Sequence, residues 1–192
     1  SGVCSSDLVT AFLGFETLDL TASVVAIHDG TRFVDSWSGD GAVSVVLDQT
    51  PFYAESGGQV GDRGRLIADG VAMTVLDTRK SGGAIVHYCQ SETGALSIGD
   101  QLQAAVSPNV RQNTARHHSA THLLHAALRA VLGDHVNQRG SLVSADRLRF
   151  DFSHFEGVTA EELQAIERLC NEEILKNTPI STDVMSVDAA KE

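Results

Sequence analysis

The sequence has no long apolar run, few cysteines and no leader-like start, and each shortage excludes a class of protein. No stretch of the 192 residues approaches the apolar length needed to span a bilayer, and SGVCSSDLVT lacks the basic and apolar regions of a signal peptide. The three cysteines (Cys4, Cys89, Cys170) lie far apart with no C-x-x-C pair, which indicates a reducing compartment and no disulfide framework. We therefore expect a soluble, cytoplasmic protein with no membrane partner.

Basic residues are also scarce, with 14 Lys and Arg against 25 Asp and Glu, for a formal charge of −11. Taken alone, this balance predicts no affinity for polyanions. Between residues 111 and 149, however, the balance reverses locally, because only Asp134 and Asp146 oppose the arginines. These are Arg111, Arg116, Arg129, Arg139, Arg147 and Arg149. The segment is either an ordinary solvated surface or a local surface that binds phosphate.

The order of the expected elements predicts an α+β protein in two parts. From about residue 18 to 107, short runs rich in Val and Ile alternate with Gly, Asp and Ser, a pattern typical of a small β-barrel or sandwich. Beyond Pro108 the period becomes helical. We expect a helix over 110–132 that ends at Gly133, followed by a strand or hairpin over 140–155. A second helix is expected over 159–177, because Thr159 and Glu162 form a capping-box pattern at its start. A strand over 179–187 and the start of a further helix at 188–192 complete the expected order.

Four of the eight histidines lie in RHHSATHLLH, residues 116–125. His118 and His122 are one helical turn apart, His125 continues their row, and the row lies opposite the apolar stripe of the same helix, whereas His117 is expected at the surface. Two imidazoles at this spacing can bind a zinc ion, but the absence of a glutamate between them excludes the His-Glu-x-x-His metalloprotease motif. Because zinc needs three or four protein ligands, the sequence predicts half of a metal site, with simple packing as the alternative.

A second unusual segment is DQTPFYAESGGQVGDRG, residues 48–64. Glycines at this density permit positive φ and allow the backbone to approach a ligand, although a hairpin or bulge within a barrel explains them equally well. No Lys-Ser/Thr follows, so the segment is not a P-loop. The tripeptide Gly57-Gly58-Gln59 also occurs in translation release factors, where it lies at the ester that links peptide to tRNA.

The two segments together resemble a known family. The glycine-rich run, followed by RHHSATHLLHAALRAVLGDHVNQRGSLVSADRLRFDFSH, closely resembles the central part of bacterial alanyl-tRNA synthetases, and the resemblance extends from Phe12 to the final DAAKE. It implies that residues 1–17 are a linker from upstream tRNA-binding helices and that residues 18–108 form a translation-factor-like β-barrel. Residues 109–192 are then the first part of an α/β editing core like that of threonyl- and alanyl-tRNA synthetases, incomplete at its C-terminus.

The resemblance also implies a function. The parent attaches alanine to tRNA(Ala) with ATP, which is not bound in this region, and the editing core hydrolyses mischarged Ser-tRNA(Ala) and Gly-tRNA(Ala). His118 and His122 correspond to two zinc ligands, whose partners lie further downstream in the family. Gln138 corresponds to a glutamine near the aminoacyl group, and Gly57, Gly58 and Gln59 correspond to a motif that approaches the site from the barrel. The expected partner is the acceptor end of tRNA(Ala), with no DNA.

Two other functions stay open at this point. One is a non-catalytic module that binds tRNA or protein, in which the histidine row serves packing. The other is a metal-dependent hydrolase of small molecules, which would need further ligands that the sequence does not offer. Oligomeric state is open as well. We expect the chain by itself to be nearly inactive, because two ligands would hold zinc weakly.

Overall fold

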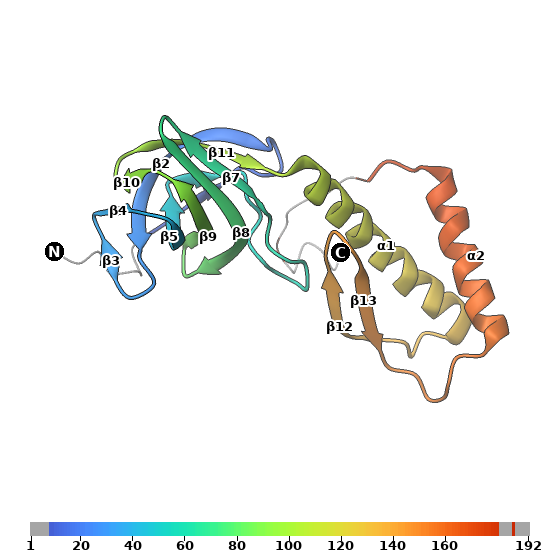
Figure 1. Cartoon of the computed structure of the whole chain (residues 1–192). Coiled ribbons are helices and arrows are strands. Elements are labelled where there is room, and N and C mark those ends of the chain that lie inside the picture. The colour runs from blue at the N-terminus through green and yellow to red at the C-terminus, as the bar shows by residue number, and fades with distance from the viewer. Residues whose placement is uncertain (1–7, 181–185, 187–192) are drawn as a thin grey trace. The chain divides into compact units, whose positions relative to one another are not determined.

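The structure is a computed structural model that describes residues 8–180 and residue 186. The described part of the chain consists of a β-rich region followed by two helices and a hairpin (Figure 1). In chain order the elements are β1 (Ala11–Phe12), β2 (Asp19–His28), β3 (Phe33–Val34), β4 (Ser36–Ser38), β5 (Gly41–Leu47), β6 (Gln49–Thr50), β7 (Gly64–Ala68), β8 (Val71–Ser81), β9 (Ala84–Thr93), β10 (Ala95–Ser97), β11 (Gln101–Val106), α1 (Pro108–Leu132), β12 (Gln138–Val143), β13 (Leu148–Phe152) and α2 (Ala160–Lys176).

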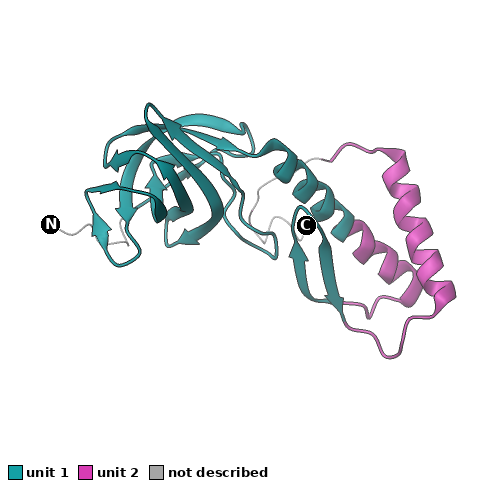
Figure 2. Ribbon diagram, in the orientation of Figure 1, with its two compact units in different colours: residues 1–121, 138–152 teal, residues 122–137, 153–192 magenta. Residues whose placement is uncertain are grey.

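The chain divides into two compact units, and the division falls inside α1 (Figure 2). Unit 1 comprises residues 1–121 and 138–152, and unit 2 comprises residues 122–137 and 153–192. Unit 1 therefore contains every strand found among the described residues, together with the first part of α1. Unit 2 contains the rest of α1 together with α2.

The strands of unit 1 form a closed barrel, which decides between the two β architectures that the sequence left open. Neighbouring strands follow the order β11–β7–β8–β9–β5–β2, and β2 pairs with β11 to close the ring. All of these pairings are antiparallel. Closure leaves no free edge in the ring, and the short pairs β1–β6 and β4–β10 lie outside it.

Alternation of side chains along each strand fills the barrel. In β11, Leu102, Ala104 and Val106 are buried, whereas Gln101 and Gln103, which alternate with them, are exposed. The same two-residue period buries the inward residues of the other strands, because successive side chains point to opposite faces of a sheet. The core includes Val24, Ile27, Val43, Val45, Leu47, Leu66, Met73, Val75 and Leu102. Full burial of each large side chain contributes about 1.5–3 kcal/mol.

Unit 1 continues into the first part of α1 and a separate hairpin. α1 begins at Pro108, where the missing N–H and fixed φ of proline suit the first turn of a helix. Gly133 has φ +113, and its N–H donates to Arg129 O, which ends the helix as predicted. The segment expected to be a strand or hairpin over 140–155 is the hairpin β12–β13, which pairs from Gln138–Phe152 to Val143–Leu148.

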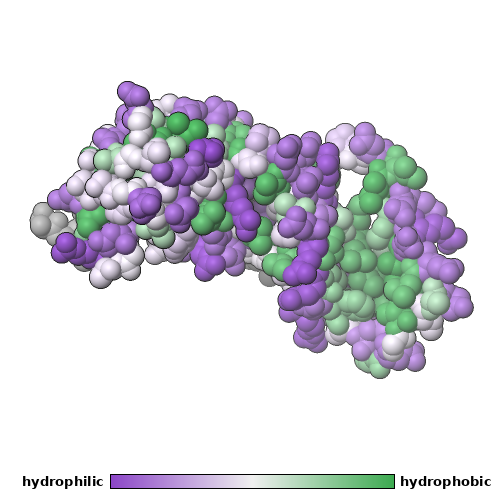
Figure 3. Space-filling model, viewed as in Figure 1, coloured by the Kyte–Doolittle hydropathy of each residue, from purple (hydrophilic) through white to green (hydrophobic). Residues whose placement is uncertain are grey.

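Unit 2 has few buried side chains and a well-formed second helix. Thr159 accepts a hydrogen bond from the backbone of Glu162, and the Glu162 carboxylate accepts one from the Thr159 backbone, so the predicted capping box is present. Hydrophobic residues gather over this unit in Figure 3, and several large ones remain exposed. These are Phe155, Leu163, Ile174, Leu175 and Ile180.

Some predictions fall outside the described residues. The strand expected over 179–187 lies largely outside the described residues, and the helix start expected at 188–192 lies wholly outside them. Among the described residues, neither α1 nor α2 has an apolar stretch of the length that a bilayer requires.

Candidate functional site

The glycine-rich segment folds into a tight turn within unit 1. Ser56 and Gln59 exchange two backbone hydrogen bonds, with N–O distances of 3.1 and 3.0 Å, and Gly57 and Gly58 occupy the two positions between them. Their φ angles are +59 and +87°. Positive φ at both central residues is the geometry of a type I′ turn, which favours glycine strongly. The hairpin that the sequence allowed for this segment is therefore present.

The turn lies directly against strand β12. Val143 N donates to Gly58 O at 2.8 Å and Val60 N donates to Val143 O at 3.0 Å, so that Gln59 forms a parallel bridge with Val143. A Cβ on Gly58 would lie 2.3 Å from Ser141 Oγ and 2.7 Å from Ser141 O. Only a residue without a side chain fits at this position. Gly57 is different, because nothing lies within 4 Å of the place where its Cβ would be.

Gln59 points from the turn to helix α1. Its side chain is buried, and its Oε1 lies 2.6 Å from Nδ1 of His118. The helix that the histidine spacing predicted thus places His118 against the glycine-rich segment, 59 residues earlier in the chain. The resemblance implied that the glycine-rich motif approaches the site from the barrel, but it did not specify a direct contact between these two residues.

Gln138, the first residue of β12, is the last of the predicted site residues in this region. It is exposed, and its Nε2 donates to Ser141 Oγ at 3.2 Å. Ser141 consequently touches both the Gly58 position and Gln138. Four residues predicted for the site, Gly58, Gln59, His118 and Gln138, are therefore linked through direct contacts or through Ser141. Ser141 itself was missed, because only the register of the hairpin places it there.

The second histidine of the predicted metal pair is also on α1. His118 and His122 are both exposed and are one helical turn apart, so they are not part of the buried face of the helix. Within residues 8–180 and 186, no group of three or more His, Cys, Asp or Glu residues could hold a metal ion. Two imidazoles are suitable donors for zinc, but they supply only part of the three or four ligands that the ion requires.

One histidine lies elsewhere than predicted. His117, expected at the surface, is half-buried, and its Nδ1 lies 2.7 Å from Ser144 O in the turn of the hairpin. The neutral or charged ring must donate through Nδ1 to this carbonyl. His117 thus holds α1 to the hairpin, next to the site that His118 shares with Gln59.

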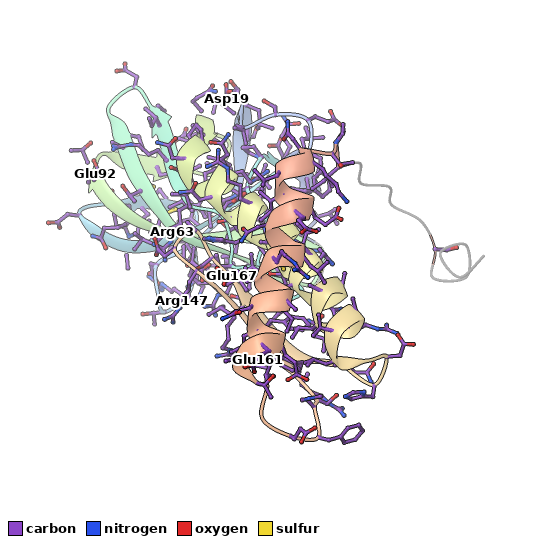
Figure 4. The ribbon with its side chains drawn as sticks, turned by 90° about the vertical axis from the view of Figure 1, so that its right-hand side faces the viewer. Asp19, Arg63, Glu92, Arg147, Glu161 and Glu167 are labelled. Atoms are coloured by element: carbon purple, nitrogen blue, oxygen red, sulfur yellow. The ribbon has the colours of Figure 1, made fainter. Side chains whose placement is uncertain are left out.

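The arginines between residues 111 and 149 do not act as one group. Arg111 is largely buried and forms an ion pair with Asp62, so it is not available to a phosphate. Other arginines of unit 1 are exposed, including Arg147 in the hairpin turn, which is labelled in Figure 4 together with Arg63 of the barrel. The exposed members within 111–149 are Arg116, Arg129, Arg139, Arg147 and Arg149.

Comparison with known proteins identifies the family. A family model described as tRNA synthetases class II (A) matches residues 3–110, which is more than half of the chain. The chain belongs to the class II tRNA synthetases. The match covers the barrel and ends within the first turn of α1, so it includes the glycine-rich segment but not His118 or Gln138.

Relatives of this chain extend the similarity across the site. Proteins named alanine–tRNA ligase from Pseudomonas syringae pv. tomato and Shewanella amazonensis are 51% and 50% identical to it, each over 96% of the chain. A protein of the same name from Halorhodospira halophila is 51% identical over 93% of the chain. The chain spans about a fifth (21%) of the length of these relatives.

Proposed function

We propose that this chain is the barrel and the first part of the editing region of an alanine–tRNA ligase. In this proposal the parent protein joins alanine to tRNA(Ala) with ATP in the cytoplasm. The region described here takes part in hydrolysis of mischarged Ser-tRNA(Ala) and Gly-tRNA(Ala). The observation that supports it is the contact of the glycine-rich turn with His118 on one side and with Ser141, the partner of Gln138, on the other.

The proposed reaction makes modest demands on the protein. An aminoacyl-tRNA ester is already labile, so a hydrolytic site needs to position the ester and water and to stabilise developing charge. The Gly58 backbone is fixed by Val143 and leaves no room for a side chain. At the neighbouring Gly57 nothing lies within 4 Å of the place where a Cβ would be, so this side of the turn is open to the close approach of a substrate backbone or ribose.

Zinc fits this proposal as an ion for which this chain supplies only some of the ligands. His118 and His122 would provide two imidazole ligands, and the remaining ligands would come from outside the described residues. When bound, the ion would polarise the ester carbonyl or activate a water molecule. The residues of this chain would orient the ion and the substrate around it.

For Ser-tRNA(Ala), selectivity against the correct alanine ester follows from one functional group. Serine differs from alanine by a hydroxyl, and a site that hydrogen-bonds a hydroxyl rejects an analogue without it by about ten-thousandfold or more. Gln138 and Ser141 are the polar side chains placed beside the turn, and their mutual contact leaves the amide oxygen of Gln138 able to accept. We assign the recognition of the serine hydroxyl to this pair.

The acceptor end of tRNA(Ala) is the proposed partner. Three arginines on the β12–β13 hairpin are exposed and belong to the same unit as Gln59, His118 and Gln138, namely Arg139, Arg147 and Arg149. Guanidinium groups on a hairpin can contact phosphates and fix the orientation of the RNA. The overall charge of −11 confines such contacts to this local surface.

A deacylation assay tests the function. Full-length enzyme should hydrolyse Ser-tRNA(Ala), and His118→Ala or Gln138→Ala should lower the rate about 100-fold or more while alanylation is retained. The chain described here should be nearly inactive, and a version extended in the C-terminal direction should recover hydrolysis. Unchanged clearance of Ser-tRNA(Ala) by both variants would exclude the editing role.

A non-catalytic RNA-binding role is the second candidate, supported by the exposed arginines of the hairpin. In that case His118→Ala and His122→Ala would leave serine clearance intact. Replacement of Arg147 and Arg149 by Gln would instead weaken tRNA binding and flatten its dependence on salt. The two candidates thus make opposite predictions for the histidine variants.

A further inference from the structure

We propose that Gln59 is a positioning residue that holds His118 as the Nδ1–H tautomer and makes Nε2 the basic nitrogen of the ring. This inference deepens the proposed function, and its importance for editing rests on that function. The tautomer itself follows from the contact between the two side chains. It can therefore be tested apart from activity.

The hydrogen bond between Gln59 and His118 has only one possible donor, which is the histidine ring. Gln59 Oε1 lies 2.6 Å from His118 Nδ1, and an amide oxygen can only accept a hydrogen bond. The ring must donate through Nδ1. Because a neutral imidazole carries a single N–H, its lone pair is then on Nε2, and this is the atom that can bind a metal ion or accept a proton.

Gln59 is itself held firmly enough to impose this choice. Its backbone N–H and C=O both bond to Ser56, and Gly58 and Val60 on either side are bonded to Val143. The residue as a whole is only 8% exposed, so the amide has little freedom to turn away. The barrel loop thus selects one state of a histidine on α1.

A fixed tautomer matters wherever a histidine acts as a ligand or base. Metal-binding histidines almost always donate their other ring N–H to a neighbouring acceptor, and loss of that acceptor typically costs 10–100-fold in metal affinity or activity. In this protein the acceptor would be an amide oxygen from the glycine-rich turn. The role we assign to Gln59 is therefore exerted through His118 and not through contact with the substrate.

Nitrogen NMR of the metal-free protein, labelled with ¹⁵N-histidine, gives the first test. At a pH where imidazole is neutral, correlations from the carbon-bound ring protons report which nitrogen carries the proton. The His118 signals are assigned by their loss in His118→Asn. We expect a pyrrole-type shift for Nδ1 and a pyridine-type shift for Nε2. A protonated Nε2, or an averaged mixture of the two forms, in the unmodified protein would overturn the proposal without any variant.

Variants of Gln59 provide the second test. Gln59→Glu keeps an acceptor oxygen and should retain the Nδ1–H tautomer, whereas Gln59→Leu should shift His118 to a mixture or to Nε2–H. Gln90→Leu, an exposed glutamine on β9, is the matched control and should leave the His118 signals unchanged. Retention of the Nδ1–H tautomer in Gln59→Leu, or its equal loss in the Glu and Leu variants, would show that the acceptor oxygen of Gln59 does not set the tautomer, and would overturn the proposal.

Zinc affinity of the full-length enzyme, measured by competition with a chelator, links the tautomer to the site. We expect Gln59→Leu to lower the affinity about 10–100-fold and Gln59→Glu to retain it. Equal affinities in the Leu variant and the unmodified enzyme would overturn the link to the metal. If the tautomer results hold but His118→Ala leaves serine clearance unchanged, the proposed editing function fails while the assignment of the tautomer stands.

Discussion

Arg111 on α1 forms a largely buried ion pair with Asp62 of the loop between β6 and β7. Arg111 Nε lies 3.0 and 2.9 Å from the two carboxylate oxygens, and the terminal nitrogens donate to Gly14 O and Pro51 O at 2.8 and 2.9 Å. The Asp62 carboxylate in turn accepts from Tyr53 N at 2.7 Å. One guanidinium thus binds three separate segments of unit 1 to the start of α1.

Removal of this guanidinium should destabilise unit 1 strongly. Arg111→Leu leaves the Asp62 carboxylate buried without its partner, and breaking a buried pair in this way costs about 3–5 kcal/mol. Chemical denaturation, followed by the fluorescence of the single tryptophan, Trp37, measures the free energy of unfolding. Arg116→Leu, at an exposed position on the same helix, is the control. Equal stability of the two variants would contradict the role given to Arg111.

The contact between Gly58 and Ser141 predicts a difference between two adjacent glycines. Gly58→Ala places a methyl group 2.3 Å from Ser141 Oγ and should separate the turn from β12. Gly57→Ala meets no neighbour and should cost only the backbone strain of positive φ, about 1–2 kcal/mol. Hydrogen exchange of the Val143 amide reports the contact directly. Similar exchange rates in the two variants would argue against a close approach at Gly58.

His87 in the barrel core should make stability depend on pH. Its ring is fully buried between Thr50 Oγ1 and Val45 O, and desolvation lowers its pKa from 6.5 to about 4. Between these values the unfolded chain binds the proton and the folded barrel does not, so the free energy of unfolding falls as the pH falls through 6.5 toward 4. The full effect is about 3 kcal/mol.

Unfolding measurements at several pH values test this dependence. His87→Gln should flatten the slope of stability between pH 6.5 and 4 even if it lowers stability at every pH. His28→Gln, on the same sheet but not in the core, should keep the slope. A slope that survives in His87→Gln would show that other groups cause the acid sensitivity.

Helix α2 should open more readily than the barrel. Of its side chains only Ile166 is buried, and its N-terminus depends on the Thr159–Glu162 capping box. Thr159→Ala should destabilise the helix locally by about 1 kcal/mol, which is about a fivefold faster amide exchange in its first turns. Exchange in β5 and β9 should not change. Thr178→Ala, beyond the end of the helix, serves as the control.

Much of the fold could be predicted because it depends on local patterns. The period of two in segments such as QLQAAV, the helical spacing after Pro108 and the Thr159–Glu162 pair each act within a few residues, and all three are present in the structure. Closure of the ring by β2 and β11 could not be predicted, because it joins strands about 80 residues apart whose edges carry no distinguishing sequence.

The candidate site, like the fold, could be predicted from the sequence only in part. Resemblance and spacing selected Gly58, Gln59, His118 and Gln138 as residues of interest, but they did not say which of them touch. The contact of Gln59 with His118 and the position of Ser141 depend on the docking of a barrel turn against α1 and β12. The half-burial of His117 and the burial of Arg111 depend on the same docking.

By itself, the sequence determined that a β-rich part precedes two helices separated by a strand or hairpin, and that two histidines share a face of α1. Only the tertiary structure decided that the β-strands close into a ring and that an amide from the barrel meets the ring of His118. The reason is physical: periodicity and capping are properties of neighbouring residues, whereas a hydrogen bond across 59 residues exists only after packing has brought both side chains to the same place.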